Sequence, residues 1–170
     1  APSALFPDTD GACERRIASL RRLVERARKC GIDIYLYMNE PRAMETSFFK
    51  DRENIRGVQE GDYFALCTSA PEVRRWLADS LTYVFKQVPD LGGVFTITAS
   101  ENLTNCYCHG RTAAGCPRCS KRSGPEVIAE VNRTIAQGVW AGNPNARVIA
   151  YDWGWPDVTP AGWGGHDWAT

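Results

Sequence analysis

Helical and strand-like segments alternate three times along this chain, and this alternation constrains its fold more than any other feature. Each helical segment carries apolar side chains at three- and four-residue spacing, and each leads into a short apolar run. The predicted helices begin at Cys13, Pro71 and Pro125, and the predicted strands cover residues 32–38, 93–99 and 146–151. Strands separated by helices pair in parallel through crossover connections, so the sequence predicts an α/β fold.

The segments that follow the predicted strands are long and polar, whereas those that follow the helices are short. The longest runs from Asn39 to about Ser69, which is too long for a plain connection and predicts a functional loop. This asymmetry is typical of a (β/α)8 barrel, whose ligand site lies at the carboxyl ends of its strands.

A complete barrel takes about 250 residues, and this chain has 170. We therefore predict a partial (β/α)8 TIM barrel made of three consecutive parallel βα units. A small three-layer α/β domain is the alternative. Residues 1–170 are predicted to form a single partial barrel domain, with a Cys-rich loop insertion at 102–124.

The charge balance and the absence of long apolar runs exclude two classes of partner. Lysine plus arginine and aspartate plus glutamate both number 20, so the formal net charge is +0 and a general nucleic-acid binder is not expected. No apolar run is long enough to span a membrane, so no membrane partner is expected. The compartment stays open: periplasmic or secreted if a signal peptide has been removed, and cytoplasmic otherwise.

Polar, acidic and aromatic residues stand directly after each predicted strand. In chain order they are Asn39, Glu40, Arg42, Ser100, Glu101, Asn102, Asp152, Trp153 and Trp155. Because the carboxyl ends of parallel strands meet at one edge of a sheet, we expect these residues to line one site. Carboxyl groups beside an aromatic platform suit the hydrolysis of glycosidic bonds, in which one acid protonates the leaving oxygen. We predict a glycosidase with Glu101 as general acid/base, Glu40 as a second catalytic residue and the others binding substrate.

Simpler interpretations apply to several of these residues. A single glutamate after a strand more often forms a loop salt bridge, and Trp153 and Trp155 also fit a packed core. Two other functions remain open: a non-catalytic carbohydrate-binding barrel, and a metal-dependent enzyme that uses the Cys-rich loop. Sugar binding without turnover would identify the first, and metal analysis addresses the second.

Four of the seven cysteines form two close pairs in one loop. They are Cys106, Cys108, Cys116 and Cys119. Two such pairs can supply a tetrahedral thiolate set for zinc, with His109 as a possible replacement for one thiolate. Four protein ligands leave no open coordination position, so we predict a structural zinc and no catalytic cofactor. Two disulfides would hold the loop equally well in an oxidising compartment.

The remaining three cysteines are scattered along the chain. They are Cys13, Cys30 and Cys67. Cysteine commonly packs as a small apolar residue, and we expect these three to stand apart from the loop set.

The segment Leu66-Cys67-Thr68-Ser69-Ala70-Pro71-Glu72-Val73, followed by a helix and a strand with an acidic end, resembles glycoside hydrolase family 20 β-N-acetylhexosaminidases. In that family the strand ends in an Asp-Glu pair, in which Glu is the general acid and Asp orients the N-acetyl group of the substrate. The resemblance implies that Glu101 is the acid. Ser100 stands where the family has Asp.

The Cys-rich loop is similar to that of bacterial domains related to family 163 endo-β-N-acetylglucosaminidases, in which a Cys-x-Cys…Cys loop follows a strand. The tripeptide Asn39-Glu40-Pro41 also resembles the Asn-Glu-Pro of clan A glycosidases, whose Glu is the acid/base. These resemblances cover about residues 12–155. They imply a substrate that is an N-acetylhexosamine-containing or complex glycan, and further strands on both sides of this segment.

Overall fold

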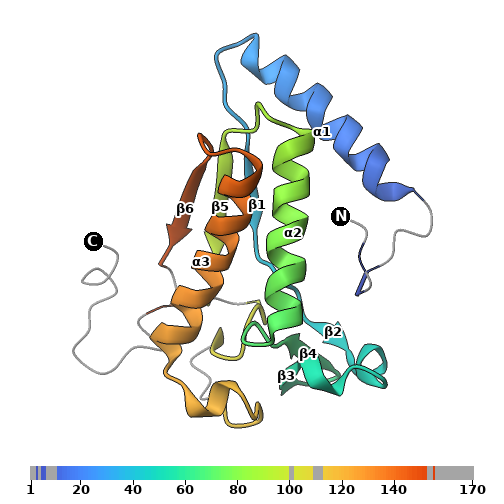
Figure 1. The fold of residues 1–170 in the computed structure, drawn as a ribbon, viewed down its shortest axis with the longest axis vertical. Coiled ribbons are helices and arrows are strands. Elements are labelled where there is room, and N and C mark those ends of the chain that lie inside the picture. Colours follow the sequence, from blue (N-terminus) through green and yellow to red (C-terminus); the bar gives the residue numbers. More distant parts are fainter. Residues whose placement is uncertain are drawn as a thin grey trace. The chain divides into compact units, whose positions relative to one another are not determined.

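The computed structural model describes residues 3, 5–6, 11–99, 102–108, 113–152 and 155 (Figure 1). Its helices are α1 (Ala12–Arg28), α2 (Pro71–Gln87) and α3 (Gly124–Gly142), with 3₁₀ turns at Thr46–Phe49, Glu53–Ile55 and Cys119–Lys121. Its strands are β1 (Tyr35–Met38), β2 (Met44–Glu45), β3 (Arg56–Glu60), β4 (Tyr63–Leu66), β5 (Gly93–Ile97) and β6 (Arg147–Tyr151). Among these residues, no helix has the length and apolar character needed to cross a membrane.

Strands β1, β5 and β6 form a parallel sheet in that order, and each is reached through a helix. The predicted parallel pairing of three strands that alternate with helices is therefore confirmed, and no barrel closes within the described residues. The central strand β5 is buried on both faces, as Val94 and Thr96 are fully buried and Ile97 nearly so. Gly93 allows close approach to β6, because a Cβ there would lie 2.0 Å from the carbonyl oxygen of Arg147.

A second sheet occupies the segment predicted to be a long loop. Strands β2, β4 and β3 pair antiparallel in that order, with Met44 opposite Phe64 and a register shift in β3 between Arg56 and Gln59. Gly61, with φ of 55°, forms the turn between β3 and β4. The prediction of one long functional loop from Asn39 to about Ser69 is thus wrong in its secondary structure, because short strands there find partners within the same segment. Its functional role stays a prediction.

The structure divides into two compact units, each built from segments that are distant in sequence. The first comprises Ala1–Tyr37, Arg75–Phe95 and Thr134–Ile149, and the second comprises Met38–Arg74, Thr96–Arg133 and Ala150–Thr170. The second unit therefore contains the antiparallel sheet, the Cys-rich loop and the residues after the parallel strands. The single domain predicted from the sequence stays a prediction.

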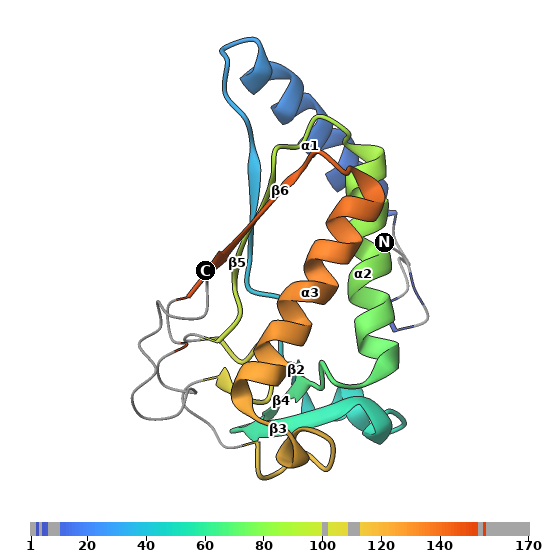
Figure 2. The ribbon, with the colours of Figure 1, turned by 60° about the vertical axis from the view of Figure 1, so that its left-hand side comes forward.

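Within the first unit, the C-terminal parts of helices α2 and α3 run side by side (Figures 1 and 2). Two glycines of α3 make this close packing possible. An added Cβ at Gly138 would lie 2.6 Å from the carbonyl oxygen of Ala78, and one at Gly142 would lie 2.6 Å from the Cβ of Phe85.

Candidate functional site

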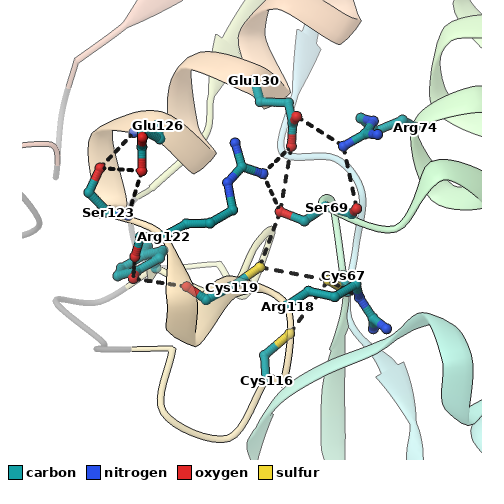
Figure 3. A network of polar contacts seen from close by, with 11 residues as sticks. Cys67, Ser69, Arg74, Cys116, Arg118, Cys119, Arg122, Ser123, Glu126 and Glu130 are labelled. Carbon is teal, nitrogen blue, oxygen red and sulfur yellow. Dashed lines mark hydrogen bonds and ion pairs between the residues drawn. The ribbon is translucent and has the colours of Figure 1, made fainter.

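Four buried cysteine side chains converge in the second unit. They are Cys67, Cys106, Cys116 and Cys119, and their sulfur atoms all lie within 4.8 Å of one another. The Sγ of Cys67 is 3.5 Å from that of Cys116 and 3.7 Å from that of Cys119 (Figure 3). A tetrahedral zinc ion with Zn–S bonds of about 2.3 Å separates its sulfurs by about 3.8 Å. The group could therefore hold a metal ion such as zinc.

Two distant segments bring these sulfurs together. Cys67 follows β4 directly, and its backbone N–H donates to the carbonyl of Ile55 at 2.8 Å. Cys116 and Cys119 lie in one turn, in which the N–H of Ser120 donates to the carbonyl of Cys116 at 3.0 Å. The ligands thus come from the end of the antiparallel sheet and from the loop after β5, and a shared ion would join them.

The prediction that Cys67 stands apart from the loop cysteines is wrong, and Cys108 lies outside the converging group. The Sγ of Cys108 instead accepts the backbone N–H groups of Thr104 at 3.2 Å and Asn105 at 3.3 Å. Cys106 and Cys108 share one tight turn, and the sulfur of Cys108 caps that turn. In the sequence, no local spacing rule links Cys67 to Cys116, which is 49 residues away.

The other thiol predictions have mixed outcomes. All seven cysteines are free thiols, so the disulfide alternative has no bond to support it. Cys13 is half-buried and Cys30 is exposed, and both lie outside the converging group as expected. His109 lies outside the described residues.

Strand β3 leaves room for one of the sulfurs by means of a glycine. A Cβ added at Gly57 would lie 2.8 Å from the Sγ of Cys106 and 2.9 Å from the carbonyl oxygen of Ala65. Any larger residue would therefore displace either the sulfur or the backbone of β4. The absence of a side chain at Gly57 thus lets β3 lie close to the Sγ of Cys106.

Hydrogen bonds among these thiols shift their pKa values in opposite directions. A hydrogen bond with Cys106 lowers the pKa of Cys67 to about 6, and the side chain of Arg118 adds to this effect. A hydrogen bond with Cys106 also lowers the pKa of Cys116, whereas the hydrogen bond with Cys116 raises the pKa of Cys106. Buried thiols this close cannot all ionise without a cation, which would favour the thiolate form of each.

The loop that carries Cys106 is tied to the end of β5. The hydroxyl of Thr104 donates to the carbonyl oxygen of Thr98 at 3.1 Å, and the side-chain amide of Asn105 donates to the same oxygen. The Oδ1 of Asn105 accepts the N–H of Tyr107 at 2.7 Å. Thr104 and Asn105, which directly precede the candidate ligand Cys106, thus hold the carboxyl end of β5 in place.

The hydroxyl of Thr98 links the same strand end to the segment after β6. Its Oγ1 accepts the side-chain N–H of Asn132 at 3.0 Å and the indole N–H of Trp155 at 3.3 Å. Trp155 is buried and packs with Ala99 and Ile128. The packed alternative therefore describes Trp155 better than an open platform for a sugar ring.

The residues after β1 combine a perturbed carboxyl group with an unpaired polar atom. Burial raises the pKa of Glu40, although its carboxylate accepts the N–H of Arg42 at 2.9 Å and lies 3.5 Å from the Arg42 Nε. Asn39 is buried, and its Oδ1 has no hydrogen-bond partner in the described part of the chain. The Oγ1 of Thr68 is likewise buried without a hydrogen-bond partner in the described part of the chain.

The other predicted substrate residues are placed only in part. Asn102 and Asp152 are half-buried after β5 and β6, and Arg42 is exposed beside Glu40. Ser100, Glu101 and Trp153 lie outside the described residues. Comparisons with protein-family models, curated proteins and solved structures each found no match to this chain. The family resemblances therefore stay predictions that rest on sequence motifs.

Proposed function

We propose that Cys67, Cys106, Cys116 and Cys119 bind one zinc ion with a structural role. The single observation that carries this proposal is the convergence of four fully buried sulfurs at separations close to those of a tetrahedral site. Thiolate ligands favour zinc or iron over hard cations such as Mg²⁺. Four protein ligands leave no open position for water or substrate, which supports a structural role over a catalytic one.

Metal analysis of cysteine variants tests this proposal. The chain, purified under reducing conditions, should contain about one zinc ion. Cys67→Ser should lose the metal, whereas Cys108→Ser should keep it, because a serine oxygen can accept the same backbone N–H groups. The reverse result, with metal lost only in the Cys108 variant, would favour the ligand set predicted from the sequence. If these cysteines bind iron in place of zinc, the proposed identity of the metal would be wrong, whereas the proposed set of ligands would stand.

We also propose that the residues after β1, β5 and β6 form a site that hydrolyses N-acetylhexosamine-containing or complex glycans. The observation that favours it is Glu40, whose pKa is raised by burial at the end of a parallel strand. A carboxyl group that keeps its proton toward neutral pH suits general acid catalysis. The buried, unpaired Oδ1 of Asn39 would gain from a hydroxyl or N–H donor on a ligand.

In this proposal Glu101 is the general acid/base and Glu40 is the second carboxyl group. One would protonate the leaving oxygen while the other stabilises or attacks the oxocarbenium-like centre. The remaining predicted residues would bind the sugar. Trp155 would instead hold the end of β5 in place through its hydrogen bond to Thr98. The partial barrel belongs to the same proposal. It is supported by the open sheet, whose edge strands carry the exposed side chains of Tyr37 and Ile149.

Turnover and binding of N-acetylhexosamine oligosaccharides by the full-length protein test the second proposal. Glu40→Gln and Glu101→Gln should keep binding but lower turnover by about 10²- to 10⁴-fold. Glu45→Gln, an exposed position on β2, is the matched control and should leave turnover unchanged. Binding without turnover by the unaltered protein would favour a non-catalytic carbohydrate-binding barrel. If the protein neither binds nor hydrolyses these oligosaccharides, both functions are excluded.

A further inference from the structure

A guanidinium group contacts the candidate metal centre from outside the sulfur group. Arg118 lies beside Cys67 (Figure 3), and its Nε donates to the Sγ of Cys67 at 3.1 Å. The Nη2 of Arg118 donates to the carbonyl oxygen of Arg56 at 3.0 Å. Arg118 lies between Cys116 and Cys119 in the same turn. It therefore reaches from the turn that holds two sulfurs to the sulfur that comes from the other segment.

The contact between Arg118 and Cys67 would place a positive charge beside a negatively charged metal centre. Four thiolates around a divalent ion carry two net negative charges, and a buried uncompensated charge is costly. An arginine side chain keeps its proton at all relevant pH values, so Arg118 supplies a permanent positive charge beside Cys67. Its second donor, Nη2, holds the guanidinium against the backbone of β3.

A serine hydroxyl meets a second sulfur of the group. The Cys119 thiol donates to the Oγ of Ser69 at 3.3 Å, and Arg122 donates to the same oxygen at 2.7 Å. Arg122 also donates to the carboxylate of Glu130 at 2.6 Å, which fixes its position. The hydroxyl of Ser69 itself donates to a carboxylate oxygen of Glu130 at 3.5 Å. Once Cys119 gives up its proton to bind a metal, this hydroxyl would have to leave Glu130 in order to donate to the thiolate.

We propose that Arg118 and Ser69 form the outer sphere of the metal centre, and that Arg118 sets its affinity for divalent metal by donating an N–H and a positive charge to Cys67. This inference rests on the proposed zinc site. Outer-sphere partners of metal ligands typically change affinity by 10- to 100-fold. Arg118 is a positioning residue, since it touches a ligand and not the metal.

Zinc affinity and the spectrum of the Co²⁺-substituted chain test the proposal together. Arg118→Met should weaken zinc about 10- to 100-fold in competition with a chromophoric chelator. It should also shift the sulfur-to-cobalt charge-transfer band to longer wavelength, because the sulfur lone pair of Cys67 loses a stabilising donor. Arg118→Lys keeps the charge and should fall between Arg118→Met and the unaltered chain in both measurements. Arg75→Met removes an exposed arginine of α2 and should change neither.

The two readouts separate the outer-sphere role from simple support of β3. A purely supporting role would lower the thermal stability of the metal-free chain and leave the cobalt band unmoved, which would overturn the proposal. If Arg118→Met does not fold, Arg118→Lys decides, and equality with the unaltered chain in both measurements overturns it. Failure of the unaltered chain to bind zinc would overturn the site itself, whereas an unmoved band in a zinc-binding chain would overturn only the role of Arg118.

Discussion

Two buried cysteines of the second unit differ in what surrounds their sulfurs. Cys108 accepts two backbone N–H groups of its own turn, so its hydrogen-bonding capacity is used locally. Cys67 faces other thiols and the guanidinium of Arg118. At the scale of single residues, the surroundings of each sulfur and not its spacing in the sequence decide which cysteine can serve as a ligand.

Gly57 offers a test at this scale, because its missing side chain leaves room for the Sγ of Cys106. Gly57→Ala would place a Cβ 2.8 Å from that sulfur and 2.9 Å from the backbone of Ala65. We expect the free energy of unfolding to fall by about 1–3 kcal/mol, as in other overpacked sites, and zinc affinity to fall with it. Denaturant unfolding and chelator competition measure the two effects.

Gly115→Ala is the matched control for this substitution. Gly115 lies in the loop beside Cys116, and a Cβ there would meet nothing within 4 Å. It should change neither stability nor zinc affinity by much. Equal effects of the two alanines would contradict the view that β3 is fitted to the sulfur of Cys106.

At the scale of elements, an ion-pair network joins the first turn of α2, the turn after Cys119 and α3. Glu130 of α3 accepts from Arg74 at 2.9 Å and from Arg122 at 2.6 Å (Figure 3). Burial alone would raise the pKa of Glu130, but the hydrogen bond from Arg122 and the charges of Arg74 and Arg122 lower it overall. The network thus connects three elements of the second unit beside the cysteine group.

The lowered pKa makes this network a source of pH-dependent stability. A carboxyl group whose pKa is depressed on folding stabilises the folded state above its unfolded pKa of about 4.3, and the effect is lost as pH falls through the folded pKa. The unaltered chain should therefore exceed Glu130→Gln in unfolding free energy at pH 7, and the difference should shrink below about pH 4. A difference that stays constant across this range, in urea titrations of both chains, would contradict the pairing.

The helices and the parallel strands could be predicted from the sequence because each carries a long, local signal. The helix predicted from Pro71 begins there, and the strand predicted at 146–151 is found at Arg147–Tyr151. Strands β2, β3 and β4 could not be predicted, since β2 has only two residues and the three strands are stabilised by pairing with one another. Cys67 was missed for the same reason, because its partners are far away in the sequence.

At the scale of the whole molecule, metal binding and folding should be linked. An ion that binds only the folded chain stabilises it, by about 2.7 kcal/mol when its free concentration is 100 times Kd. Removing zinc with a chelator should therefore lower the Tm of the unaltered chain. Cys67→Ser should already show the lower Tm and should not respond to the chelator. A chelator-induced fall of the same size in that variant would mean that the metal is bound elsewhere.

The central claim is that one zinc ion joins the end of β4 to the loop after β5. Anomalous diffraction at the zinc absorption edge, from crystals of the reduced chain grown without added metal, tests it most directly. We predict one anomalous peak bonded at about 2.3 Å to the sulfurs of Cys67, Cys106, Cys116 and Cys119. A peak bonded to Cys108 in place of Cys67, or cysteines joined by disulfides of about 2.05 Å with no peak between them, would contradict the account.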